Sequence, residues 1–113
     1  MKPGQDLPHH MVQFLKCQSV SCTTSTLGAY ATGLRPFARF LQKQDLQLEG
    51  LRAQDLADFL GELHERKLVA YTKLNYFLTV KKYLAWEVDN DRAPEEILAA
   101  FERSKLPKIP QYL

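Results

Sequence analysis

Residues 23–44, TTSTLGAYATGLRPFARFLQKQ, carry the clearest helical pattern in this chain of 113 residues. The hydroxyl residues at the start can cap a helix, because their oxygens accept hydrogen bonds from backbone N–H groups of the first turn. Apolar residues then recur at three- and four-residue steps and form one buried stripe. The stripe comprises Leu27, Tyr30, Ala31, Leu34, Phe37, Ala38 and Leu41. Pro36 lies inside this helix, removes a backbone hydrogen bond and predicts a kink.

Four further helices are predicted around this one, and no alternating strand pattern interrupts them. Three of them cover about residues 8–19, 70–88 and 95–103, and another contains residues 55–65 after a turn over residues 45–52. Their predicted core residues are Met11, Val12, Phe14, Leu15, Leu56, Phe59, Leu60, Leu63, Leu74, Phe77, Leu78, Leu84, Val88, Ile97, Leu98 and Phe101. Tyr83 and Trp86 are expected at the edge of the core. The sequence therefore predicts an all-α bundle of four to five helices.

The composition, 45% hydrophobic and 25% charged, describes one ordinary globular domain. No apolar run is long enough to cross a membrane, and no secretion signal is recognisable, so a cytoplasmic location is expected. Cys17 and Cys22 are expected to be reduced and partly buried thiols. Grouping them with His9 and His10 does not give the usual zinc-ligand spacing, so no metal site is predicted.

Charged residues are sorted by segment, although the whole chain has a formal charge of only +2. Residues 23–44 hold three basic residues and no acid, while residues 67–88 hold four lysines and one acid, Glu87. Residues 45–66 instead hold six acids and two basic residues, and residues 89–103 hold five acids and two. This sorting predicts that the second and fourth helices form a face that binds a polyanion. The acidic helices are predicted to form a different face, for something other than the polyanion.

Nucleic acid is one polyanion that suits these helices. Hydroxyl groups and free N–H groups at a helix start are good phosphate contacts. The N-terminal half of the fourth helix also offers side chains that can donate hydrogen bonds to phosphates or base edges. Neither a glycine-rich phosphate loop nor a catalytic set can be recognised in the sequence. The chain is therefore expected to bind without acting as an enzyme and without a cofactor.

Three strings with the spacing of helix stripes carry a family resemblance. They are Thr24-Ser25-Thr26-Leu27-x-x-Tyr30-x-x-x-Leu34-x-x-Phe37-x-x-Phe40-Leu41, Leu51-x-x-x-Asp55-Leu56-x-x-Phe59-Leu60 and Thr72-x-x-Asn75-x-x-Leu78-x-x-x-Lys82-Tyr83-Leu84-x-Trp86. In this order the strings resemble the core-binding domain of tyrosine recombinases, the phage-integrase and Xer-type enzymes. Pro94 with Ile97, followed by residues 106–110, resembles the last short helix of that domain and its linker.

The resemblance implies a SAM-like orthogonal bundle that forms half of a clamp around double-stranded DNA during integration or recombination. Residues 1–8 would be an extension, residues 9–103 the DNA-binding domain, and residues 104–113 the start of a linker to a catalytic domain. In this family the second and fourth helices face the major groove, and the first helix contacts a neighbouring recombinase protomer. The implied location is the nucleoid.

The resemblance also implies particular DNA contacts, carried over by position onto the second and fourth helices. They are Thr24, Ser25, Thr26, Arg35, Tyr71, Thr72, Lys73, Asn75, Tyr76, Thr79 and Lys82. An alternative function stays open beside DNA binding. A SAM-like or death-domain-like protein-interaction module could present its acidic helices to a basic partner.

Overall fold

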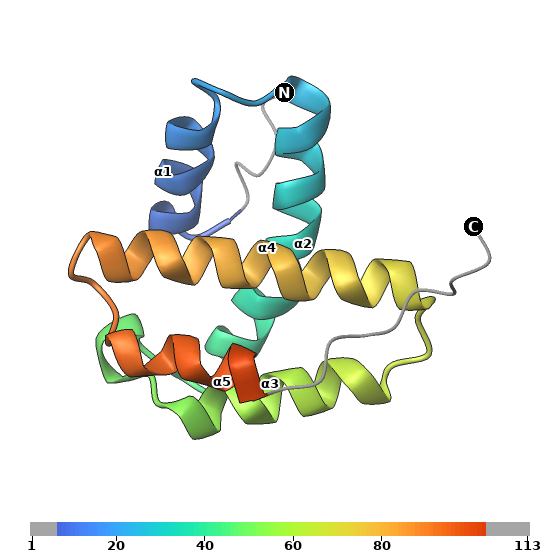
Figure 1. The fold of residues 1–113 in the computed structure, drawn as a ribbon, viewed down its shortest axis with the longest axis vertical. Coiled ribbons are helices and arrows are strands. Elements are labelled where there is room, and N and C mark those ends of the chain that lie inside the picture. Colours follow the sequence, from blue (N-terminus) through green and yellow to red (C-terminus); the bar gives the residue numbers. More distant parts are fainter. Residues whose placement is uncertain (1–6, 104–113) are drawn as a thin grey trace.

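The structure, a computed structural model, describes residues 7–103, and the regular elements within them are all helical (Figure 1). The α-helices are α1 (His9–Gln18), α2 (Thr24–Lys43), α3 (Ala53–Glu65), α4 (Ala70–Asp89) and α5 (Leu98–Arg103). Two short 3-10 helices, η1 (Leu48–Gly50) and η2 (Glu95–Ile97), precede α3 and α5. The predicted all-α bundle of four to five helices is confirmed. Most of the predicted extension and the whole predicted linker lie outside the described residues.

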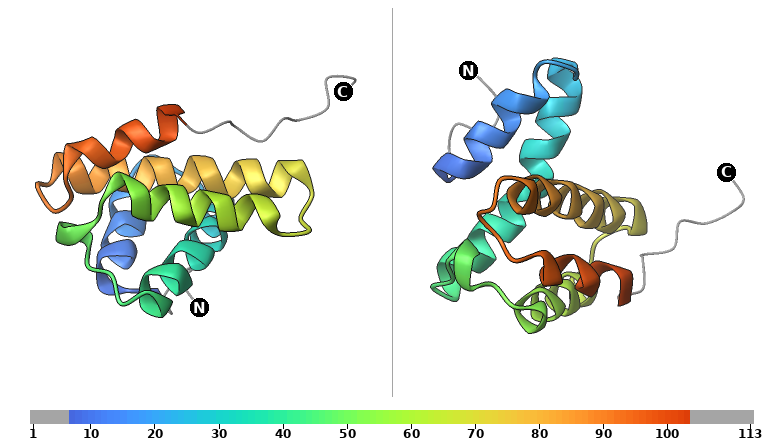
Figure 2. Two further views of the ribbon diagram at one scale, coloured as in Figure 1. Left: turned by 90° about the horizontal axis from the view of Figure 1, so that it is seen from below. Right: turned by 60° about the vertical axis from the view of Figure 1, so that its left-hand side comes forward.

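Helix α4 runs through the middle of the molecule and touches every other α-helix. Figure 1 shows α1 and the first half of α2 on one side of it, with α3 and α5 on the other. The second half of α2 passes behind α4, as the turned view in Figure 2 also shows. The acidic helix α3 is thereby separated from α1 and from the start of α2.

Helix α2 begins where its hydroxyl residues predict. Thr23 is the cap, and its Oγ1 accepts a hydrogen bond from the backbone N–H of Thr26 at 3.2 Å. The helix continues without a break through Pro36, which is buried. Its two halves run in different directions in Figures 1 and 2, in agreement with a kink rather than an end.

Aromatic side chains dominate the packing between helices. Phe59 of α3 lies between Phe37 and Phe40 of α2, with ring centroids 5.1 and 5.3 Å away. Phe77 of α4 meets Phe101 of α5 edge to face at 5.3 Å. Such pairs add to the free energy gained from burying their apolar area. Each of these contacts joins two different helices, through residues 19 to 24 positions apart in the sequence.

Most predicted core residues are confirmed as buried, but three assignments on α4 are wrong. Leu74 was expected in the core and is half-buried outside the core cluster. Leu78 was expected in the core and is 48% exposed, whereas Tyr83 was expected at the edge and is 1% exposed. Apolar residues occur nearly all round α4, so a three-to-four-residue period does not select one face. The choice of face depends on where the other helices pack, and Tyr83 is covered by Phe14 of α1.

Candidate nucleic-acid interface

The frame of the candidate interface is the crossing of α2 and α4. Gly33 and Thr79 meet there so closely that a Cβ on Gly33 would lie 2.7 Å from Thr79 Oγ1 and 2.8 Å from Thr79 Cβ. Only a residue without a side chain fits this approach. The N-terminal halves of the two helices diverge from the crossing as the arms of an open angle (Figure 1).

The crossing corrects one predicted DNA contact. Thr79 was expected on the exposed N-terminal half of α4, but it is 3% exposed and its side chain is packed against α2. A hydroxyl in this position has no access to a nucleic acid. Thr79 instead sets the distance between the two helices that carry the other predicted contacts.

On α2 the predicted contacts fall into two separate places. Thr24 and Ser25 are exposed at the start of the helix, and Thr26 is half-buried beside them. Arg35 lies near the middle of the helix, in a groove of about 760 Å³ between the start of α1 and the second half of α2. Arg39 lines the same groove. The structure therefore does not bring Arg35 together with the three hydroxyl residues.

On α4 three of the predicted contacts share one outward stripe. Tyr71, Asn75 and Lys82 are separated by four and seven residues, which places them on the same side of a helix. Tyr71 is 69% exposed, Lys82 is exposed and Asn75 is half-buried. Leu78 lies on the same stripe. This residue was missed as a surface residue because its apolar side chain suggested the core.

The remaining predicted contacts on α4 point to other sides of the helix. Thr72 and Tyr76 are half-buried, and Tyr76 packs against the core. Lys73 turns toward the end of α3, where its Nζ donates a hydrogen bond to the backbone carbonyl of His64 at 2.6 Å. A cation suits the negative C-terminal end of a helix. Lys73 therefore has a structural partner that its sequence position did not indicate.

Lys82 connects the outward stripe of α4 to the first half of α2. Its Nζ lies 3.1 Å from the Tyr30 hydroxyl and 5.2 Å from the centroid of the Tyr30 ring. A lysine over an aromatic face is held by the ring quadrupole as well as by the hydrogen bond. The ammonium group is thus positioned beside both helices while its side chain stays exposed.

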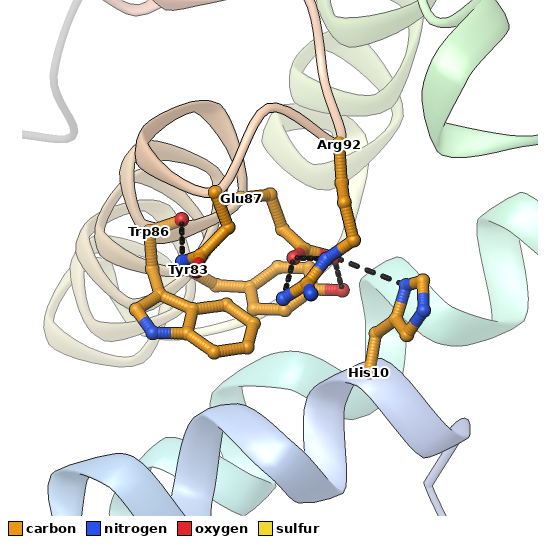
Figure 3. Close-up of polar contacts among 6 residues, drawn as sticks. His10, Tyr83, Trp86, Glu87 and Arg92 are labelled. Carbon is orange, nitrogen blue, oxygen red and sulfur yellow. Dashed lines mark hydrogen bonds and ion pairs between the residues drawn. The ribbon is translucent and has the colours of Figure 1, made fainter.

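The acid of the basic segment is turned into the protein. Glu87 is 0% exposed, and Figure 3 shows the side chains that surround it. Tyr83 donates its hydroxyl proton to Oε2 at 2.7 Å, and Arg92 donates from Nε to Oε1 at 2.8 Å. Arg92 Nη2 lies 2.8 Å from the same oxygen, an ion-pair distance without hydrogen-bond geometry. His10 Nδ1 of α1 lies 3.4 Å from Oε2.

This cluster has a direct consequence for the charge on α4. Glu87 is the only acid between residues 67 and 88, and it is buried and paired with Arg92. The outward face of α4 therefore presents Lys81 and Lys82 without a neighbouring exposed carboxylate from the same segment. Sequence reasoning missed the cluster. Its one signal was a lone acid in a basic helix, followed five residues later by an arginine.

Burial raises the pKa of the Tyr83 hydroxyl far above its ordinary value, and the hydrogen bond to Glu87 raises it further. The folded state thus favours the neutral phenol, and the stability it contributes is present below pH 10 and falls as the pH rises above that value. We expect one of the five tyrosines to ionise only when the protein unfolds. An ultraviolet titration of tyrosinate on native protein and on Tyr83→Phe checks this, because the variant should lose only the late phase. A Tyr83→Phe titration identical to that of native protein would contradict it.

Other kinds of site receive no support within residues 7–103. The described residues contain no group of three or more histidines, cysteines and acids placed to hold a metal ion. Cys17 is exposed and Cys22 half-buried, so the expectation of two partly buried thiols is wrong for Cys17. A search of the described helices for a membrane span finds none with sufficient length and apolar character.

A known protein family matches most of this chain, in agreement with the family resemblance seen in the order and spacing of its helices. Residues 11–90 match the family described as phage integrase, N-terminal SAM-like domain. The match runs from α1 to the end of α4 and so includes both helices of the candidate interface. Curated proteins and solved structures give no match. The chain belongs to the phage integrase N-terminal SAM-like domain family, the non-catalytic core-binding region of tyrosine recombinases and integrases.

Proposed function

We propose that this domain grips double-stranded DNA as the core-binding half of a site-specific recombinase, with the first halves of α2 and α4 against the duplex. The observation that carries the proposal is the inward turn of Glu87, which leaves the outward face of α4 basic. Phosphate groups supply much of the attraction in such a complex, so the lack of an exposed carboxylate between residues 67 and 88 suits it. The family match supports the same role.

The distribution of acids over the fold supports this orientation. Helices α3 and α5, whose segments are rich in acids, lie on the other side of α4 from α1 and the start of α2 (Figure 1). A duplex against the open angle of α2 and α4 would meet Thr24, Ser25, Tyr71 and Lys82. Hydroxyl and ammonium groups of this kind are common phosphate donors.

In the whole recombinase the domain would have neighbours on both sides of the DNA-binding unit. Helix α1 contacts a neighbouring protomer, which suits the 90% exposed Val20 just after its end. Residues 9–103 form the DNA-binding unit, and residues 104–113 lead to a catalytic domain that cuts and rejoins the strand. The proposed location is the nucleoid.

Titration of a labelled duplex at two salt concentrations tests the DNA-binding role. We expect the logarithm of the association constant to fall with the logarithm of salt concentration, with a slope of about −0.9 for each neutralised phosphate. Lys82→Glu should weaken binding about tenfold and make the slope shallower by about one phosphate contact. Fluorescence anisotropy measures both quantities.

Arg52→Glu is the matched control, since Arg52 is an exposed cation at the start of α3, on the other side of α4. It should change the affinity much less than Lys82→Glu. Equal losses from both variants would show that general charge, rather than α4, attracts the duplex. Absence of binding to every duplex at low salt would overturn the proposed function and favour a protein partner.

A further inference from the structure

An unusual mixture of side chains faces outward along α4. The stripe defined by Tyr71, Asn75, Leu78 and Lys82 follows steps of four, three and four residues, so it stays on one side of the helix. Two of its members are among the most exposed large apolar residues, Tyr71 at 69% and Leu78 at 48%. Leu74, half-buried, lies next to them without packing on the core. Exposed apolar residues are ordinary when scattered, but here they are aligned.

We propose that Asn75 and Leu78 of this stripe read A·T base pairs in the major groove, Asn75 at an adenine edge and Leu78 at a thymine methyl group. The inference rests on the proposed DNA-binding function and assigns it a sequence preference. The amide of Asn75 offers one donor and one acceptor, which match N7 and the amino group of adenine. Thymine is the only base with a methyl group in that groove, and an apolar side chain gains by covering it.

The dimensions of the stripe fit this assignment. Eleven residues separate Tyr71 from Lys82, which is about 16 Å along a helix. At about 3.4 Å for each base pair, that length faces about five base pairs. Asn75 and Leu78 are three residues or about 4.5 Å apart, so they address neighbouring pairs. The major groove is about 12 Å wide and accepts a helix.

The charges at the two ends of the stripe favour DNA over a second copy of the chain. Exposed Lys81 and Lys82 stand toward one end, and exposed Lys67 precedes the other. Two copies joined along this stripe would bring lysines together in either relative orientation, which is unfavourable. A duplex meets the same lysines with phosphates on both sides of the groove, while the uncharged centre lies over the bases.

Selection of binding sites from a randomised duplex library, followed by affinity measurements with the whole chain, tests the inference. We expect the selected sites to share an A·T step. Replacing the thymine of that step by uracil removes one methyl group and should weaken binding about fourfold. Asn75→Ala should weaken binding to the selected site about tenfold and relax the preference at one pair.

Leu78→Ala should abolish the difference between thymine and uracil while leaving the salt slope unchanged. Val69→Ala is the matched control, because Val69 is another exposed apolar residue, at the cap of α4 and outside the stripe. Circular dichroism checks that both variants keep the native helix content.

The possible outcomes distinguish failure of the base reading from failure of the proposed DNA-binding function. Salt-dependent binding whose affinity is unchanged by uracil, by Asn75→Ala and by Leu78→Ala would overturn the base reading. The DNA-binding role would remain intact. Absence of binding to every duplex would remove both. A dimer in sedimentation that becomes a monomer with Leu78→Ala would assign the stripe to a contact between copies and overturn the inference.

Discussion

Arg92→Ala is expected to lower the free energy of unfolding by about 3 kcal/mol, because it removes the cation from a fully buried carboxylate. Glu87 is 0% exposed and receives hydrogen bonds from Arg92 and Tyr83. Without Arg92 the carboxylate keeps its desolvation cost and loses its charge partner. For a domain of this size the midpoint of thermal unfolding should fall by about 4–8 °C for each kcal/mol. Urea unfolding followed by circular dichroism measures the difference.

Two comparisons make this expectation specific to the buried pair. Arg52→Ala removes an exposed arginine and should change stability by no more than about 0.5 kcal/mol. The double variant Glu87→Met, Arg92→Met should be more stable than Arg92→Ala, since replacing both charges by apolar groups leaves no unpaired ion. If Arg92→Ala cost no more than Arg52→Ala, Glu87 would have to be hydrated in the folded protein.

Gly33→Ala is expected to destabilise the domain by about 2 kcal/mol, although alanine is the better helix former. The new Cβ would lie within 3.0 Å of three side-chain atoms of Thr79, and a β-branched residue cannot turn both of its γ atoms away. The two helices must therefore move apart at the crossing. Thermal and chemical unfolding of the variant measure the cost.

Gly28→Ala is the control on the same helix, because a Cβ at Gly28 would meet nothing within 4 Å. Here the better helix propensity should raise the free energy of unfolding by up to about 1 kcal/mol. Adding Thr79→Gly to Gly33→Ala should recover part of the lost stability, because removing the Thr79 side chain makes room for the new Cβ at position 33. Equal effects of the two glycine substitutions would show that the crossing is looser than these distances indicate.

The sequence was sufficient for the helices themselves, because their start signals and apolar spacing are local. The hydroxyl residues before Leu27 located the start of α2, and its stripe identified most of its buried side. The same reasoning did not identify the buried side of α4. With apolar residues on nearly every side, the packing of neighbouring helices decides that Leu78 is exposed and that Tyr83 is buried, the latter against Phe14 of α1.

The candidate interface was predictable to the level of helices and less so to the level of side chains. The sorting of charge and the family resemblance both indicated α2 and α4. They did not reveal that Thr79 packs on Gly33, that Lys73 turns to the end of α3, or that Glu87 points inward. Each of these depends on a partner at least five residues away, and the spacing within one helix does not encode it.

The crossing of α2 and α4 has a consequence for how this domain can change over evolution. Positions 33 and 79 draw on one shared volume, so the size of either residue limits the size of the other. Among relatives that keep this crossing, a larger residue at the first position should be accompanied by a smaller one at the second. The two positions are therefore expected to co-vary as a pair, separated by 46 residues in the chain but by a single van der Waals contact in the fold.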